Sequence, residues 1–147
     1  MKFNESDKIT LVTGTSKGIG RAIAIGLASD GFKIGVNYCS PENKTIEISF
    51  GSIPTVLVNN ARIVHDNQLI SMSEEDFDSA ISINLKGAFL YMREAARRII
   101  SKKYGEIINI TSAVGFTGNP GVINYAVSKE RLHYMTRTIH VDGGIYM

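Results

Sequence analysis

The chain alternates short apolar runs with longer segments whose apolar residues recur at helical spacing. The apolar runs are rich in β-branched residues and predict strands at residues 9–13, 33–38, 55–59 and 106–111, with a further short strand and turn in residues 138–147. Regular alternation of strands and helices is typical of an open α/β sheet. We therefore predict a parallel sheet with helices on both faces, formed by residues 1–147 as one domain.

Helices are predicted for three segments, which are residues 19–28, residues 73–104 and a segment around Tyr125. Gly31 is the predicted C-terminal stop of the first helix. Ser73 with Asp76 resembles a capping box that opens the second helix, which has a candidate kink near residues 84–87. The segments predicted as loops are residues 41–54, with room for one helical turn, and residues 115–121.

The composition does not favour a nucleic-acid-binding, secreted or membrane-spanning protein. The 147 residues suffice for one domain with a real core. With 16 basic and 14 acidic residues the net charge is only +2, which does not favour nucleic acid. Cys39 is the single cysteine, so no disulfide can form within the chain. The N-terminal segment lacks the apolar core of a signal peptide. No apolar run approaches the roughly 20 residues that span a bilayer. We expect a soluble cytoplasmic protein without a metal.

A glycine-rich segment follows the first predicted strand and opens the first predicted helix. Gly14 allows a tight bend, Gly18 lets the backbone approach a phosphate, and Gly20 permits close packing of helix on strand. Amide groups at the start of a helix favour an anion. The predicted nucleotide-binding residues are Gly14, Ser16, Lys17, Gly18, Ile19 and Gly20. With a nucleotide-binding turn at this place, the predicted fold is a Rossmann-like, doubly wound sheet in three α/β/α layers. The alternative is that the glycine-rich segment is a structural turn that binds no nucleotide.

The choice between cofactors depends on the end of the second strand. An acidic residue there would bind the ribose 2′-hydroxyl and repel a 2′-phosphate. The strand ends at Asn37, and the first carboxylate after it is that of Glu42. Lys17 is placed to meet a 2′-phosphate, although an ordinary solvated lysine is the alternative. The pattern favours NADPH over NADH.

Three residues near the C-terminal end of the chain form a candidate catalytic group. Tyr125 and Lys129 are four positions apart and share one face of a helix. An ammonium beside a phenol favours the ionised phenol, which suits Tyr125 to donate a proton to a carbonyl. Ser112 follows a strand, at the edge where open α/β sheets bind ligands, and is suited to hold the carbonyl oxygen. Without Ser112, the tyrosine and lysine would be an ordinary helix face.

These motifs together resemble the short-chain dehydrogenase/reductases. The resemblance rests on the glycine turn, Asn59-Asn60-Ala61, Asn84, Ser112 and Tyr125-Ala126-Val127-Ser128-Lys129. Within that family, Leu57-Val58-Asn59-Asn60-Ala61 and His140-Val141-Asp142-Gly143-Gly144 are most similar to the 3-oxoacyl-(acyl carrier protein) reductases.

The resemblance implies a catalytic tetrad and a set of partners. Asn84 would orient Lys129 through a water, while Ser112 polarises the carbonyl and Tyr125 donates the proton. Beyond the glycine turn, the implied cofactor-binding residues are Asn37, Asn60, Ala61, Tyr125 and Lys129. Lys102 and Lys103 match a basic site that docks acyl carrier protein, and such enzymes form dimers or tetramers. The implied reaction is NADPH-dependent reduction of a 3-oxoacyl thioester to its 3-hydroxy form.

Three features depart from the family pattern. Arg62 stands where the family has glycine, so we expect it to crowd the cofactor's ribose unless it swings outward or contacts a phosphate. Glu130-Arg131 replace a small Ala-Gly pair, which alters a helix-paired interface. Two segments of the family pattern are missing, near residues 48–50 and 137–138, so we expect the sequence to join separated pieces of a longer enzyme. Two alternatives therefore stay open: a dehydrogenase of a sugar or other secondary alcohol, and a non-catalytic nucleotide-binding or oligomerisation remnant.

Overall fold

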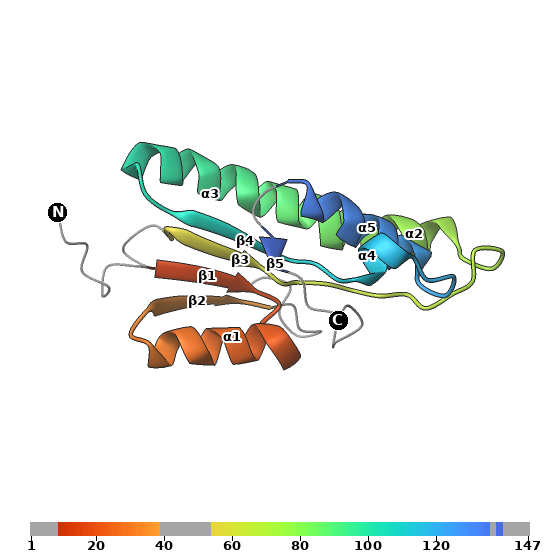
Figure 1. Ribbon diagram of the computed structural model, residues 1–147, viewed down its shortest axis with the longest axis horizontal. Coiled ribbons are helices and arrows are strands. Elements are labelled where there is room, and N and C mark those ends of the chain that lie inside the picture. Colours follow the sequence, from red (N-terminus) through yellow and green to blue (C-terminus); the bar gives the residue numbers. More distant parts are fainter. Residues whose placement is uncertain (1–8, 39–53, 136–137, 140–147) are drawn as a thin grey trace. The chain divides into compact units, whose positions relative to one another are not determined.

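The computed structural model describes residues 9–38, 54–135 and 138–139. Figure 1 shows its elements, which are β1 (Ile9–Thr13), α1 (Gly18–Ser29), β2 (Lys33–Asn37), β3 (Val56–Asn59), α2 (Glu74–Ile81), the π-helical segment η2 (Ser82–Gly87), α3 (Ala88–Lys102), β4 (Glu106–Ile110), α4 (Val114–Thr117), α5 (Ile123–His133) and β5 (Thr138–Ile139). The backbone separates into two compact units. The first holds the described residues up to Ala61 together with Tyr91–Ile107, and the second holds Arg62–Leu90 with the described residues from Ile108 onward.

The first unit is built around β1. Its strands lie in the order β2-β1-β3-β4, and β1 pairs in parallel with both neighbours. Ile9 and Val12 of β1 are buried, as the apolar run predicts. α1 lies against β1 and β2, and Figure 1 shows α1 and the Tyr91–Lys102 part of α3 on opposite faces of these strands. The prediction of a Rossmann-like α/β sheet is confirmed.

Gly31 marks the return from α1 to the sheet. It has φ +88°, a conformation that side chains disfavour, and its N–H donates to the carbonyl of Ala28. The predicted stop at Gly31 is therefore confirmed, and the four main strands begin and end within two residues of their predicted bounds.

The second predicted helix is one continuous run of α2, η2 and α3. Ser73 caps it, since its hydroxyl accepts a hydrogen bond from the N–H of Asp76 at 3.1 Å. The predicted kink near residues 84–87 is a π-helical turn, and such turns are frequent at functional sites. No helix in the described part of the chain has both the length and the apolar character that crossing a bilayer requires.

One loop prediction is wrong in part. Residues 115–121 were expected to be loop from their glycines and proline, but α4 forms at Val114–Thr117. The N–H groups of Phe116 and Thr117 both donate to the carbonyl of Ala113, which closes the turn despite the composition. Gly118, with φ +69°, ends it. The other predicted loop at residues 41–53, and residues 140–147, lie outside the described residues.

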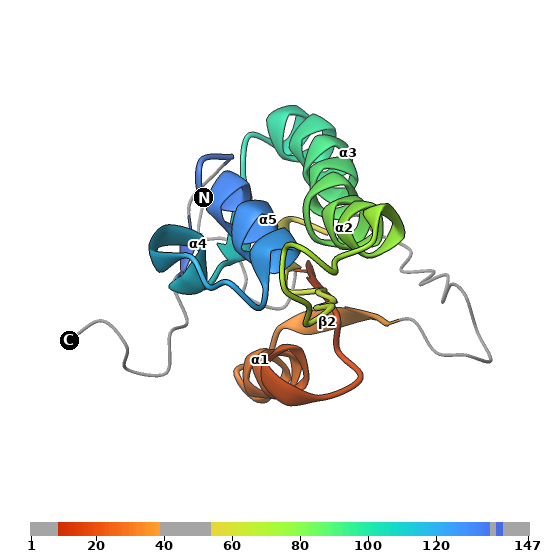
Figure 2. The ribbon, with the colours of Figure 1, turned by 90° about the vertical axis from the view of Figure 1, so that its right-hand side faces the viewer.

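The second unit gathers α2, η2 and α4 against α5. Figure 2 shows α2 and α5 side by side. α4 and α5 approach closely at Gly115, where an added Cβ would lie 2.8 Å from the backbone nitrogen of Glu130. Leu132 of α5 is buried in this unit, and β4 pairs in parallel with β5 through Asn109 and Ile110.

The cap at Ser73 generates a stability prediction. Ser73→Ala leaves the N–H of Asp76 without its partner and should lower the free energy of unfolding by about 1 kcal/mol, whereas Ser73→Asp keeps an accepting oxygen and should stay near wild type. Urea unfolding of both variants measures the difference. Equal losses in the two variants would show that the cap bond is unimportant.

Candidate active site

Thr13 joins the end of β1 to the end of β3. Its hydroxyl accepts hydrogen bonds from the backbone N–H groups of Asn60 and Ala61, both at 3.0 Å. The Asn60 side-chain amide donates to the carbonyls of Thr13 and Gly14, also at 3.0 Å. The predicted residues Asn60 and Ala61 therefore lie directly behind the glycine turn.

The three glycines of the turn differ in the space around them. An added Cβ at Gly14 would lie 2.7 Å from the Cα of Ala61, and one at Gly20 would collide with the Asn60 side chain and the Gly14 carbonyl. Gly18, by contrast, has φ +60° and open space where a Cβ would stand. Backbone can thus pack tightly at the first and third glycines and meet a ligand at the second.

The start of α1 suits a phosphate group. Lys17 is its N-cap residue and makes no side-chain cap bond, and the first turn holds no acidic residue. The first amides of this 12-residue helix are therefore available to an anion, next to a positive charge. Ser16, Gly18 and Ile19 are exposed here, as a binding surface requires. The turn fits the pyrophosphate of a nicotinamide dinucleotide.

Asn37 supports the turn through its backbone. Its carbonyl accepts from the N–H of Gly14 at 2.7 Å and from the N–H and hydroxyl of Thr15 at 3.2 and 3.3 Å. This places the end of β2 beside the turn, as predicted. Tyr38, the next residue, is the last described one before the gap, so Glu42 and Cys39 lie outside the described residues.

In the second unit, Asn84 is the centre of a buried polar network. It is 0% exposed, its Oδ1 accepts from the N–H of Ile63 at 2.8 Å, and its Nδ2 donates to the carbonyl of Ile63 at 2.9 Å. Nδ2 also donates to the hydroxyl of Ser128 at 3.1 Å, and that hydroxyl donates to the carbonyl of Tyr125 at 2.8 Å. Asn84 therefore connects the Arg62 segment to α5.

Lys129 is buried beside the candidate acid. Its side chain is 2% exposed, and its Nζ donates to the carbonyl of Ile110 at 2.7 Å and lies 5.7 Å from the ring centroid of Tyr125. Burial lowers the pKa of Lys129 to about 8, and the positive charge of Arg62 lowers it as well. The ammonium is retained at neutral pH and lost in mildly alkaline solution.

Ser112 lies two residues beyond the end of β4. Lys129 bonds to the last carbonyl of that strand, so the lysine and the serine are attached to the same strand end. The Ser112 backbone carbonyl accepts from the N–H of Gly115 at 3.0 Å, which turns the chain into α4. Asn84 is thus linked through Ser128 to the backbone of Tyr125, and Lys129 lies near the Tyr125 ring while bonding to the strand end that precedes Ser112.

Ser128 and Asn124 are positioning residues that the sequence interpretation missed. Both are fully buried on α5. The Nδ2 of Asn124 donates to the carbonyls of His65 and Asp76, both at 3.3 Å. Their position next to Tyr125 and Lys129 in the sequence could have indicated a role in the site. Their hydrogen-bond partners, however, are remote in sequence.

His65, Asp76 and Ser79 form a second polar cluster. The Ser79 hydroxyl lies 3.0 Å from His65 Nε2, and His65 Nδ1 lies 3.6 Å from the Asp76 carboxylate. The order of groups resembles a hydrolytic triad. However, the Ser79 hydroxyl also has the Asp76 carbonyl of α2 as an acceptor, at 3.2 Å, so His65 is not its one available partner. The cluster holds the residue 62–67 segment on α2.

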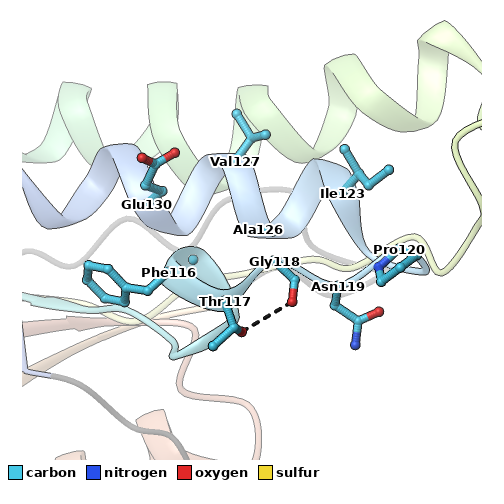
Figure 3. Close-up of a pocket in the computed structure, with 10 residues that line it drawn as sticks. Phe116, Thr117, Gly118, Asn119, Pro120, Ile123, Ala126, Val127 and Glu130 are labelled. Carbon is cyan, nitrogen blue, oxygen red and sulfur yellow. Dashed lines mark hydrogen bonds between the residues drawn. The ribbon is translucent and has the colours of Figure 1, made fainter.

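A shallow cavity lies between the segment of residues 115–120 and α5. Figure 3 shows that it is bounded by the α4 segment from Phe116 to Pro120 and by α5 side chains, including Val127 and Glu130. None of the four predicted catalytic residues lines it. It is therefore separate from the network around Lys129.

Comparison with known proteins decides the family. The family profile described as short chain dehydrogenase matches residues 43–146. The chain belongs to the short-chain dehydrogenase family. Its fold agrees: the crystal structure of a protein proposed to be a gluconate dehydrogenase, from Agrobacterium tumefaciens, superposes with a TM-score of 0.79 at 30% identity, over 88% of this chain and 63% of that one.

Curated relatives within the short-chain dehydrogenase family share more sequence. A 3-oxoacyl-(acyl-carrier-protein) reductase FabG from Rickettsia prowazekii is 41% identical over 159 residues, which covers 92% of this chain and 66% of the relative. The FabG of Staphylococcus epidermidis is 35% identical over 165 residues, covering 90% of this chain and 67% of the relative. The predicted resemblance is confirmed.

This chain is short for the short-chain dehydrogenase family. It spans about two thirds of the length of these curated relatives. The alignment of 165 positions is longer than the chain's own 147 residues, so some positions of the relative inside the alignment face no residue here. This finding agrees with the expectation of missing internal segments.

Asn84→Ala tests the network. The change leaves the N–H and carbonyl of Ile63 and the hydroxyl of Ser128 without their partner, so it should lower the free energy of unfolding by roughly 2–3 kcal/mol. Chemical denaturation measures it. Asn67→Ala, which removes exposed bonds near Ser71, is the control and should cost clearly less. Equal effects would contradict the role given to Asn84.

Burial of Lys129 predicts a pH dependence of stability. Between the folded pKa of about 8 and the usual value of 10.5, the unfolded chain still holds a proton that the folded protein has released. The free energy of unfolding should therefore rise with pH across this window, by up to roughly 3 kcal/mol, while the cost of the buried charge is fully present below pH 8. Lys129→Met should remove this rise. Urea unfolding of both proteins from neutral to alkaline pH provides the comparison, and parallel curves would refute the assignment.

Proposed function

We propose that this protein reduces the carbonyl of a 3-oxoacyl thioester carried by acyl carrier protein, with NADPH as reductant. The observation that supports the proposal is the proximity of Lys129 to the Tyr125 ring on α5, together with the hydrogen bonds that link Asn84 through Ser128 to the Tyr125 backbone. The curated relatives at 35% and 41% identity, both 3-oxoacyl-(acyl-carrier-protein) reductases, support the substrate class.

The cofactor proposal rests on the glycine turn. Gly14, Ser16, Gly18, Ile19 and Gly20 would hold the pyrophosphate, and Asn37, Asn60 and Ala61 would line the adenosine side. Lys17 would pair with a 2′-phosphate, which favours NADPH over NADH. When bound, NADPH supplies a hydride to the carbonyl carbon.

Residues of this chain would supply the proton and hold the carbonyl oxygen in place. Tyr125 donates the phenol proton to the carbonyl oxygen as the alcohol forms, and it regains a proton from solvent. Ser112 holds the same oxygen, and stabilises the negative charge that develops on it. Lys129, charged at neutral pH, stabilises the tyrosinate and binds a ribose hydroxyl. Asn84 would orient Lys129 through a water.

Docking of the carrier protein would use the end of α3. Lys102 closes that helix, and Lys103 follows it with φ +54°. Both are exposed, and neither takes part in an ion pair among the described residues. Two adjacent cations of this kind suit an acidic carrier protein. A cytoplasmic dimer or tetramer is part of the same proposal.

A second candidate is oxidation of a sugar acid or other secondary alcohol. It is favoured by the likeness to the protein proposed to be a gluconate dehydrogenase. The same tetrad would act in reverse, with the tyrosinate of Tyr125 taking the hydroxyl proton. Activity with gluconate and NADP⁺ in place of acetoacetyl thioester and NADPH separates the two candidates.

Tyr125→Phe is the decisive variant. It removes the proton donor while keeping the ring, so turnover of acetoacetyl thioester should fall roughly a hundred- to ten-thousand-fold with NADPH affinity nearly unchanged. NADPH absorbance follows turnover, and fluorescence titration follows binding. An active variant would show that Tyr125 is not the acid. A wild-type protein that binds NADPH but turns over neither substrate would be a non-catalytic remnant.

A further inference from the structure

Arg62 is an unusual second cation at the candidate acid. Its guanidinium carbon lies 5.7 Å from the ring centroid of Tyr125, the same distance as the Nζ of Lys129. The next residue, Ile63, is held on both sides by the Asn84 side chain, so the backbone that carries Arg62 is anchored in the buried network. Two positive charges therefore share one tyrosine ring.

These charges have no acidic partner in the described part of the chain. The ion pairs there join His65 to Asp76 and Glu94 to two arginines of α3. Arg62 itself is exposed to solvent. Its charge is nevertheless felt at the buried ammonium, since it contributes to the lowered pKa of Lys129. A ligand that meets Tyr125 thus enters an uncompensated positive field.

An arginine in this position suits a carboxylate. The planar guanidinium presents paired N–H donors that match the two oxygens of a carboxylate. The contact with the Tyr125 ring keeps the guanidinium carbon 5.7 Å from the ring centroid. A negative group close to the reacting carbonyl would satisfy Arg62, whereas a neutral ester or thioester leaves it unpaired.

We propose that Arg62 is an anion-binding residue of this site and that it enables the site to bind carbonyl compounds that carry a carboxylate, such as a free 3-oxo acid. The inference rests on the proposed function in that it takes Tyr125 as the group that meets the substrate carbonyl. It adds a carboxylate-bearing 3-oxo compound to the 3-oxoacyl thioester of the proposed function.

The test compares two probes that differ in charge. Acetoacetate and its neutral ethyl ester are titrated into the full-length protein by calorimetry, without NADPH. Arg62→Gln should weaken acetoacetate binding about tenfold, the effect of one exposed charge-assisted contact, and leave ester binding unchanged. Arg62→Lys, which keeps the charge, should retain most of the acetoacetate affinity. Arg131→Gln, an exposed arginine of α5, is the matched control and should bind both probes like wild type.

Several results would overturn the proposal. They are unchanged acetoacetate binding in Arg62→Gln, equal weakening for acid and ester, and no acetoacetate binding by wild type. A loss of NADP⁺ affinity with acetoacetate affinity intact would assign Arg62 to a cofactor phosphate instead. Failure of the proposed function is distinguishable, because Tyr125→Phe keeps the ring beside Arg62 and should still bind acetoacetate. Arg62-dependent binding without any reductase turnover would leave the anion site standing and refute the reductase.

Discussion

The structure of the second unit depends on one buried amide. Asn84 bonds both backbone groups of Ile63 and the hydroxyl of Ser128, which passes the connection to the backbone of Tyr125. A fully buried amide with all these partners is stable only when each partner is in place, so the network holds one arrangement of the segments it joins. The π-helical turn at Ser82–Gly87 is the local distortion that carries Asn84.

The burial of Lys129 opposes the charged form of its side chain. A lysine buried at 2% exposure carries a large desolvation cost, which its hydrogen bond to the Ile110 carbonyl offsets only in part. The lowered pKa is the sign of that imbalance. Burial on α5 therefore disfavours the ammonium of Lys129. Because perturbed pKa values of this kind are common at functional sites, the burial supports the role proposed for Lys129.

The sequence predicted most of the fold, but not the hydrogen bonds that connect the residues of the candidate site. Strands came from apolar runs, and the first helix from its glycine stop, because these signals are local. α4 was missed because its hydrogen bonds override a composition typical of loops. Ser128 and Asn124 were missed because their partners lie some 44 to 59 positions away, beyond any local pattern.

The positive charge of Arg62 lowers the pKa of Lys129. Arg62 makes the ammonium of Lys129 less stable, because like charges repel in a buried setting. An anion bound by Arg62 would cancel part of that repulsion and so favour the charged lysine. The two effects must be reciprocal, since linkage requires that a ligand which stabilises the ammonium is itself bound more tightly when Lys129 is protonated. Arg62 would thereby couple the charge of the substrate to the protonation state of Lys129.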